Sequence, residues 1–234
     1  MTDDELKAVL RERIAAVAAR MTAACQRAGR DRAAVALVAV TKTVSVRVAA
    51  MLPELGIVDL GENRPQELWK KAAAIPGIRW HFTGHLQRNK VDPTLKFSTM
   101  MHTLDSERLA LAVHEFGTKR GQPVPVLLEV NCSREEAKGG FAPEELPAVA
   151  DKLTALSGLH IDGLMTMAAH AENPEECRPA FVELRGLRES LRTRTGLSLP
   201  QLSMGMSNDF EIAIEEGATS IRLGTTLFAG LEAE

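Results

Sequence analysis

Lys42 is the residue whose position best suggests covalent chemistry. It stands two residues after the apolar run VALVAV, which ends at Val40. A nearly continuous apolar run is typical of a parallel strand that is buried on both faces. A lysine just beyond such a strand is partly desolvated, so it loses its proton more easily, and its neutral amine can attack a carbonyl group. Lys42 is therefore a candidate nucleophile; the alternative interpretation, a solvated loop lysine, is equally compatible with its position.

Two turns near the end of the chain are rich in hydrogen-bond donors. One is Ser203-Met-Gly-Met-Ser207-Asn-Asp209, and the other is Arg222-Leu-Gly224-Thr225-Thr226. Glycine lets a backbone approach a ligand closely, and free N–H groups where a helix begins favour an anion. The two turns together predict a phosphate cradle, although Ser207 could instead be only a helix cap.

Other polar residues follow apolar runs but have simpler interpretations. Asn63 comes after Gly61-Glu62 and could line the site or cap the next helix. Lys138 lies in a loop before Gly139-Gly140, where a solvated charge is the simpler interpretation. His81 and His85 are four residues apart, but Gly84 separates them and no third ligand stands at a suitable spacing. We expect no metal site.

The candidate residues follow β-type runs that alternate with helical segments. We count eight such runs: Val35–Val40, Ile57–Leu60, Ile78–Thr83, Phe97–Leu104, Val124–Val130, Leu159–Met165, Leu199–Met204 and Thr219–Leu223. Strand and helix alternation indicates right-handed parallel crossovers. Eight units predict a single closed (β/α)8 barrel of the TIM type, with a doubly wound open sheet as the alternative. Catalytic barrels carry their sites at the carboxyl ends of the strands, where the candidate residues fall.

Two long helices have clear end signals. Thr2 and Glu5 have the spacing of a capping box, and apolar residues recur with helical period from there to Gly29, which predicts an extra helix at the amino end. A second long helix should begin with Asn173 as cap and Pro174 at its first position, and end near Gly196. No linker or change in composition divides the chain, so we expect one domain over residues 1–234.

Composition excludes several classes of partner. The net charge of −3 over 234 residues is too small to favour nucleic acid or a membrane surface. Cys25, Cys132 and Cys177 form neither a metal-binding pattern nor a disulfide framework, and the acidic start lacks the features of a secretory signal. We expect a cytoplasmic protein.

An amine near the first strand end and a phosphate cradle at the last two would suit an aldehyde that carries a phosphate. Pyridoxal 5′-phosphate (PLP) and sugar phosphates are both such molecules. The residues alone leave both open.

Six motifs, in order along nearly the whole chain, give this sequence a family resemblance. They are Val-Ala-Val-Thr-Lys42-Thr, Gly61-Glu-Asn-Arg-Pro-Gln-Glu, His81-Phe-Thr-Gly-His-Leu-Gln-Arg-Asn-Lys90, Gly163-Leu-Met-Thr-Met167, Ser203-Met-Gly-Met-Ser-Asn-Asp209 and Arg222-Leu-Gly-Thr-Thr-Leu-Phe228. Together they resemble the pyridoxal phosphate homeostasis protein family. The resemblance implies a fold like the N-terminal barrel of alanine racemase, without that enzyme's C-terminal β domain.

The resemblance also implies roles for individual residues. Lys42 would form a Schiff base with the cofactor, Arg222 would face its pyridine nitrogen, and Lys138 matches a lysine proposed to take part in cofactor transfer. The remaining implied contacts are a phosphate held around Ser203, Ser207, Gly224 and Thr225, and a ring near Asn63 and Met165. One departure is visible, since Arg64 stands where many members have a tyrosine after Gly-Glu-Asn.

The implied activity is to hold PLP and to buffer it or deliver it to apo-enzymes, with no catalytic residues assigned. Racemases of the alanine racemase type use a lysine and a tyrosine of the partner subunit, and this chain has no tyrosine. That absence, with the missing domain, favours a monomer. A permanent cation such as Arg222 at the ring nitrogen also disfavours carbanion chemistry, which argues against transamination more than against racemisation. The alternatives are a low-activity amino-acid racemase and a Schiff-base aldolase acting on a sugar phosphate.

Overall fold

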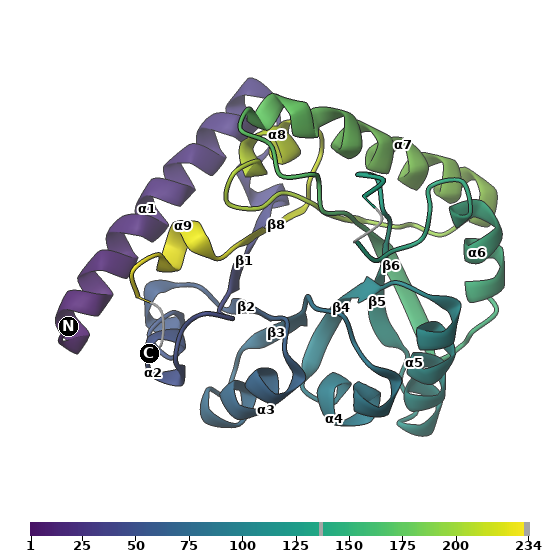
Figure 1. Cartoon of the computed structure of the whole chain (residues 1–234), viewed down its shortest axis with the longest axis horizontal. Helices are drawn as coiled ribbons and strands as arrows, with labels where there is room; N and C mark the ends of the chain where they lie inside the picture. The colour runs from purple at the N-terminus through teal and green to yellow at the C-terminus, as the bar shows by residue number, and fades with distance from the viewer. Residues whose placement is uncertain (136–137, 232–234) are drawn as a thin grey trace.

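The computed structural model describes residues 1–135 and 138–231 as a closed parallel barrel in which strands β1 to β8 follow their order in the chain (Figure 1). The barrel prediction is thus confirmed, and the open-sheet alternative is wrong. The strands within the described residues are β1 Ala36–Val40, β2 Asp59–Glu62, β3 Arg79–Phe82, β4 Ser98–Leu104, β5 Val124–Glu129, β6 Leu159–Met165, β7 Gln201–Ser203 and β8 Ser220–Leu223.

Helices surround the barrel and connect successive strands. The α-helices are α1 Asp3–Arg27, α2 Val46–Ala49, α3 Pro65–Ala74, α4 Val91–Leu95, α5 Glu107–Lys119, α6 Leu146–Leu153, α7 Arg178–Thr195, α8 Phe210–Glu215 and α9 Thr225–Phe228. Short 3-10 turns are η1 Arg32–Ala34, η2 Pro53–Leu55, η3 Arg88–Lys90 and η4 Pro174–Cys177. None of the described helices is long and apolar enough to cross a bilayer.

The extra amino-terminal helix is present as α1. Thr2 and Glu5 form the predicted capping box, in which each side chain bonds the backbone N–H of the other residue. Its buried face, which includes Leu10, Val17 and Met21, packs along α8 and α9 (Figure 1). Because α1 covers α8 and α9, it supports the segments that carry the predicted phosphate cradle.

The last long helix differs slightly from the prediction. Asn173 caps the turn η4, accepting from the N–H of Glu175, and α7 then begins at Arg178. Gly196 ends α7 with a left-handed backbone (φ 74°), as its type predicts.

Strand ends also differ from the sequence prediction, most importantly in β2. The apolar run suggested that the strand would end at Leu60, but it extends to Glu62 because Gly61 and Glu62 pair with β3. Glu62 is fully buried, as are Thr41 and Lys71. A charged residue inside the barrel wall requires a partner, and this partner shapes the site described next.

Candidate functional site at the carboxyl end of the barrel

Lys42 lies directly beyond β1, on the rim of the barrel. Thr41 is fully buried and continues the β1–β2 pairing through a 2.9 Å bond from its N–H to the carbonyl of Gly61. Lys42 itself is exposed. This corrects the expectation of a partly desolvated lysine: the strand is buried, but the chain turns outward at its end.

A buried ion pair holds the backbone just before Lys42. The amine of Lys71, on α3, lies 2.5 Å from Glu62 Oε1 and 2.6 Å from the carbonyl oxygen of Thr41. The Thr41 hydroxyl donates to the same Glu62 oxygen at 2.8 Å. Lys71 thus fixes the carbonyl that immediately precedes Lys42. Sequence analysis missed this cluster, because neither the burial of Glu62 nor the approach of α3 is visible in the local pattern.

The two donor-rich turns form one continuous surface. The backbone N–H of Thr226 donates to Ser207 Oγ at 3.1 Å, and the Thr226 hydroxyl lies 3.5 Å from the carbonyl of Ser207. The N-cap of α8 is Asp209, so Ser207 is not the cap of that helix. The alternative interpretation of Ser207 is therefore wrong.

The turn after β8 packs against the end of β1. The two strands pair through Ala39 and Leu223, and a Cβ atom on Gly224 would lie 3.3 Å from the carbonyl oxygen of Val40. Thr225 follows with an exposed side chain. Strand order therefore makes the Lys42 turn and the Gly224 turn neighbours on the same rim, as the predicted site requires.

Arg222 and Ser203 lie below this rim, inside the barrel. Ser203 has no exposed surface, and Arg222 is 5% exposed. Arg222 donates to Ser203 Oγ and, at 3.0 Å, to the carbonyl of Thr166. Burial lowers the pKa of Arg222 to about 10, against the opposing effect of Glu129 and Asp209, so the side chain stays a cation at neutral pH. The Ser203 hydroxyl already has protein partners, so its predicted phosphate contact is less direct than that of Ser207.

The predicted ring contacts come from β6 and from the segment after β2. Met165 ends β6, is 1% exposed and pairs with both Glu129 and Ser203. The cap of α3 is Arg64, so Asn63 does not cap that helix. The Oδ1 atom of Asn63 is buried and has no hydrogen-bond partner among the described residues. An unpaired buried amide is costly and indicates that it is available to a ligand.

Two titratable residues at this end, Glu129 and Asp105, were missed by the sequence analysis. Glu129 ends β5 and is 6% exposed; burial raises its pKa to about 7, and the nearby Asp105 carboxylate acts in the same direction. Asp105 Oδ2 lies 2.7 Å from Nδ1 of the exposed His85. The only local signal for Glu129 is its place near the end of an apolar run. His85 and His81 take different partners, and no cluster of three metal-binding side chains exists among the described residues.

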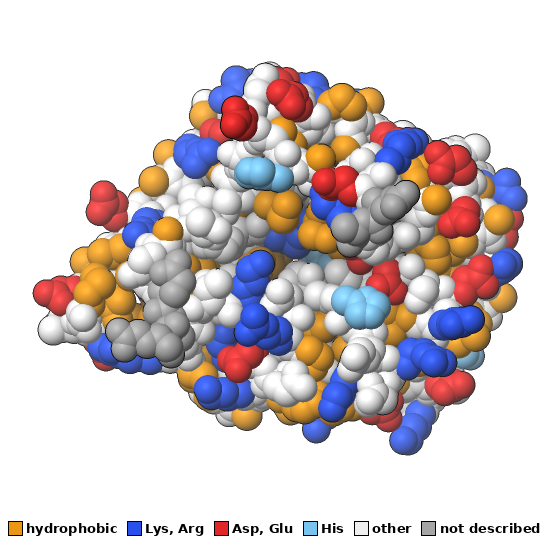
Figure 2. Space-filling view, in the orientation of Figure 1, with side chains coloured by type: hydrophobic (Ala, Val, Ile, Leu, Met, Phe, Trp, Pro, Cys, Tyr) orange, Lys and Arg blue, Asp and Glu red, His pale blue; other side chains and the backbone are white. Residues whose placement is uncertain are grey.

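Lys138 lies over the loops after β5 and β6. Its amine donates to the carbonyl of Ala168 at 2.9 Å and pairs with Glu135, leaving the side chain 25% exposed. Both residues line a cavity of about 220 Å³ together with Met206 and Asp209. Lys138 is thus not a freely solvated loop charge. The cavity that it lines does not include Lys42. On the face drawn in Figure 2, Lys and Arg side chains gather beside the central hollow.

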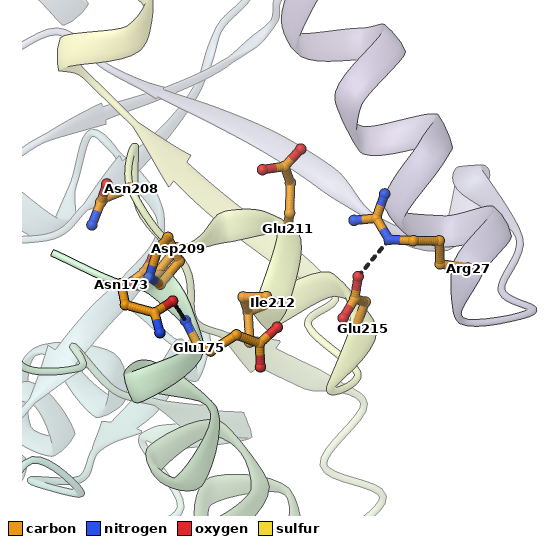
Figure 3. Close-up of a pocket in the computed structure, with 9 residues that line it drawn as sticks. Arg27, Asn173, Glu175, Asn208, Asp209, Glu211, Ile212 and Glu215 are labelled. Carbon is orange, nitrogen blue, oxygen red and sulfur yellow. Dashed lines mark hydrogen bonds and ion pairs between the residues drawn. The ribbon is translucent and has the colours of Figure 1, made fainter. Parts of the chain in front are cut away.

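A second cavity, of about 330 Å³, lies outside the barrel mouth between α1, α8 and η4 (Figure 3). Arg27 and Glu215 pair at one end of it, and Asn173 and Glu175 lie at the other. Its glutamates are engaged with arginines, as Glu211 is with Arg20, and Asp209 accepts from the N–H of Met206. None of the predicted cofactor-binding residues lines this cavity.

Comparison with known proteins agrees with the family resemblance of the six sequence motifs. The alanine racemase N-terminal domain family matches residues 13–232. The pyridoxal phosphate homeostasis protein of Aquifex aeolicus is 42% identical over 219 residues, which cover 93% of this chain and 96% of the relative. A protein of unknown function from Bifidobacterium adolescentis superposes with a TM-score of 0.90 at 35% identity, covering 97% and 98% of the two chains.

A further solved structure is PipY of Synechococcus elongatus PCC7942, described with PLP bound. It superposes with a TM-score of 0.81 at 30% identity, and the match covers 94% of this chain and all of PipY. The sequence motifs, the barrel and these full-length matches agree, and the chain belongs to the pyridoxal phosphate homeostasis protein family, within the alanine racemase N-terminal domain group.

Proposed function

We propose that this protein binds PLP at the carboxyl end of the barrel, with Lys42 as the Schiff-base residue, and acts in PLP homeostasis by buffering or delivering the cofactor. The observation that carries the proposal is the joining of the turns after β7 and β8, through Ser207 and Thr226, beside the end of β1 that leads to Lys42. An aldehyde that bears a phosphate can span those two features. The PLP-bound PipY structure and the names of the homeostasis relatives support this choice over a sugar phosphate.

The residues present fit this cofactor. Ser207, Thr225 and the backbone around Gly224 offer neutral donors for a phosphate, and Gly224 leaves room beside Val40 for a close backbone approach. The buried, unpaired Oδ1 of Asn63 is available for a polar group of the ring. When bound, PLP supplies an aldehyde for a lysine amine and a phosphate for the cradle; the chain binds, orients and shields it.

Arg222 would lie beneath the ring and face its nitrogen. Because it is a donor only and remains a cation, it opposes protonation of that nitrogen. A ring without that proton withdraws electrons less strongly, so it stabilises a carbanion less well. This favours a carrier over a transaminase-like catalyst.

The absence of tyrosine also supports a carrier. Racemisation needs a proton-transfer group on each side of the reacting carbon, and no copy of this chain can offer a tyrosine. The hydrogen-bonded pair of His85 and Asp105 is one candidate for such a proton-transfer group under the racemase hypothesis. Lys138, which lines the neighbouring cavity, is the candidate for passing the cofactor onward to apo-enzymes.

Absorbance spectroscopy tests the proposal directly. The protein incubated with PLP should absorb in the visible range, lose that band on borohydride reduction, and yield a modified peptide that contains Lys42. Lys70→Ala, which changes an exposed lysine on α3, is the matched control and should retain the adduct. A reduced adduct on another lysine would refute the Lys42 assignment. Turnover of a single amino-acid enantiomer that vanishes in Lys42→Ala would replace the carrier with a racemase.

A further inference from the structure

A hydrogen-bonded chain of side chains runs through the barrel from its amino end to Arg222. Asp59 Oδ1 lies 3.0 Å from His81 Nε2, and His81 Nδ1 lies 2.9 Å from His102 Nε2. His102 Nδ1 lies 2.8 Å from Ser203 Oγ, which accepts from Arg222. We call these five residues the barrel relay. Each comes from a different strand, in the order β2, β3, β4, β7 and β8.

The two ends of the barrel relay determine the protons between them. Arg222 can only donate, so Ser203 Oγ accepts from it and the Ser203 hydroxyl is left to donate to His102 Nδ1. His102 must then carry its proton on Nε2 and donate to His81 Nδ1. His81 in turn donates from Nε2 to the Asp59 carboxylate. Every donor has an acceptor, and both histidines are neutral.

The opposite arrangement leaves a buried group unsatisfied. If His102 carried its proton on Nδ1, Ser203 Oγ would accept from both His102 and Arg222. Among the described residues the Ser203 hydroxyl has no other hydrogen-bond partner, and Ser203 has no exposed surface. An unsatisfied buried hydroxyl is unfavourable by about 1–3 kcal/mol. The first arrangement is therefore preferred.

The charges around the barrel relay agree with this arrangement. Burial holds the pKa of His102 well below its ordinary value, and the Arg222 cation acts in the same direction. At the amino end, burial acts to raise the pKa of Asp59, but His81 and Arg79 outweigh it and hold it below the ordinary value. At the other end, burial lowers the pKa of Arg222, and the carboxylates of Glu129 from β5 and Asp209 after β7 act to raise it.

We propose that His81 and His102 are positioning residues for Arg222, with Asp59 at the far end of the barrel fixing the tautomer of each. The inference rests on the proposed function only in its last step, where Arg222 faces the ring of the cofactor. Asp59 and Arg222 are charged groups of opposite sign, and the neutral residues between them are polarised in one direction. Arg222 is thereby held as a donor to Ser203, and its second nitrogen is fixed on Thr166.

Nitrogen NMR of the cofactor-free protein, with labelled histidine and arginine, tests the first part. We expect His81 and His102 each to show an unprotonated Nδ1 and a protonated Nε2, without averaging between tautomers. The Arg222 guanidinium should give separate terminal-nitrogen signals because its rotation is hindered. In His81→Leu those signals should average and His102 should become a tautomer mixture, whereas in His81→Gln, which can still accept and donate, they should stay as in the wild type.

His160→Gln, which changes an exposed histidine on β6, is the matched control and should alter none of these signals. If His81→Leu does not fold, Asp59→Asn replaces it, since it removes the charge with almost no change in size. A proton on Nδ1 of His102 in the wild type, or Arg222 signals that do not change in His81→Leu or in its substitute Asp59→Asn, would overturn the proposal.

The cofactor-loaded protein tests the last step separately. His81→Leu should shift the midpoint of the pH titration of the visible band and weaken PLP binding roughly tenfold, as expected for one displaced hydrogen bond. His81→Gln should restore both. An unchanged titration, with the NMR result as expected, would show that the relay does not act on the cofactor while PLP binding stands. A failure of wild-type protein to bind PLP would refute the proposed function and leave the relay result intact.

Discussion

Replacing Lys71 with methionine would remove the ammonium group that neutralises Glu62 inside the barrel wall. Both side chains have no exposed surface, and the Lys71 amine makes two short contacts, at 2.5 Å to Glu62 Oε1 and 2.6 Å to the Thr41 carbonyl. The other carboxylate oxygen, Glu62 Oε2, already lacks a partner among the described residues. Methionine has nearly the same length as lysine, so the substitution removes the charge without opening a large cavity.

The loss of one partner from a buried ion pair destabilises a protein by about 3–5 kcal/mol, because the other charge remains buried. For a chain of this size that corresponds to a fall in the melting temperature of about 6–20 °C. The double variant Lys71→Met with Glu62→Gln removes the stranded charge as well, so it should recover most of the loss. The Thr41 carbonyl loses the Lys71 amine in both variants and keeps only the N–H of Val44, at 3.1 Å, so we expect the turn at Lys42 to be less well held.

Thermal and urea unfolding, followed by far-UV circular dichroism at one pH, would measure these effects as a double-mutant cycle. Lys70→Met is the matched control, since Lys70 neighbours Lys71 on α3 but is exposed, and its change should stay within about 0.5 kcal/mol. A loss below about 1 kcal/mol in Lys71→Met, or additive losses in the double variant, would contradict our account of the ion pair.

Three further predictions concern the cofactor and the pH dependence of stability. Lys42→Ala should abolish the borohydride-trapped adduct seen by mass spectrometry while weaker, non-covalent PLP binding persists in equilibrium dialysis; an adduct that survives would contradict the assignment. Ser207→Ala should weaken PLP binding roughly tenfold, through one lost hydrogen bond, and leave pyridoxal binding unchanged because pyridoxal lacks the phosphate; equal losses for both ligands would refute a phosphate contact. Burial raises the pKa of Glu129 to about 7 from its ordinary value of 4.5, so the folded state holds this proton more tightly than the unfolded state does. The protonated Glu129 therefore contributes fully to the stability of the folded state below pH 4.5, and this contribution, of up to about 3 kcal/mol, is lost as the pH rises through 7. In urea unfolding from pH 4.5 to 8, the free energy of unfolding should decline less in Glu129→Gln than in the wild type. Parallel curves for the two proteins would refute the shift.

The barrel could be predicted because its elements leave strong local signals. Strands such as VPVLLEV are apolar at every position but Glu129 because both faces are covered, and Thr2 with Glu5 marks the start of α1 without reference to the rest of the chain. Strand ends were less certain, since hydrogen bonding across β2 and β3, and not apolarity, carries β2 on to Glu62.

The rim of the site was predicted in part. Lys42, Ser207 and Gly224 could be singled out because they follow strand-like runs, and the carboxyl ends of barrel strands are where such sites form. Their assembly depends on the closure of the barrel, which brings β8 beside β1 although nearly the whole chain separates them. All the predicted cofactor contacts remain predictions, namely those of Lys42, Asn63, Met165, Ser203, Ser207, Arg222, Gly224 and Thr225.

The repeating strand and helix pattern, the order of the motifs and the types of residue at the strand ends can all be read along the chain, since they depend on neighbouring residues. The fold was needed to show that Lys71 pairs with Glu62, that Ser207 accepts from the N–H of Thr226, and that His102 connects His81 to Ser203. Those contacts join different strands and helices inside a closed barrel, where burial leaves each polar group few possible partners. Local sequence carries no record of that burial, so the buried polar network became visible only with the fold.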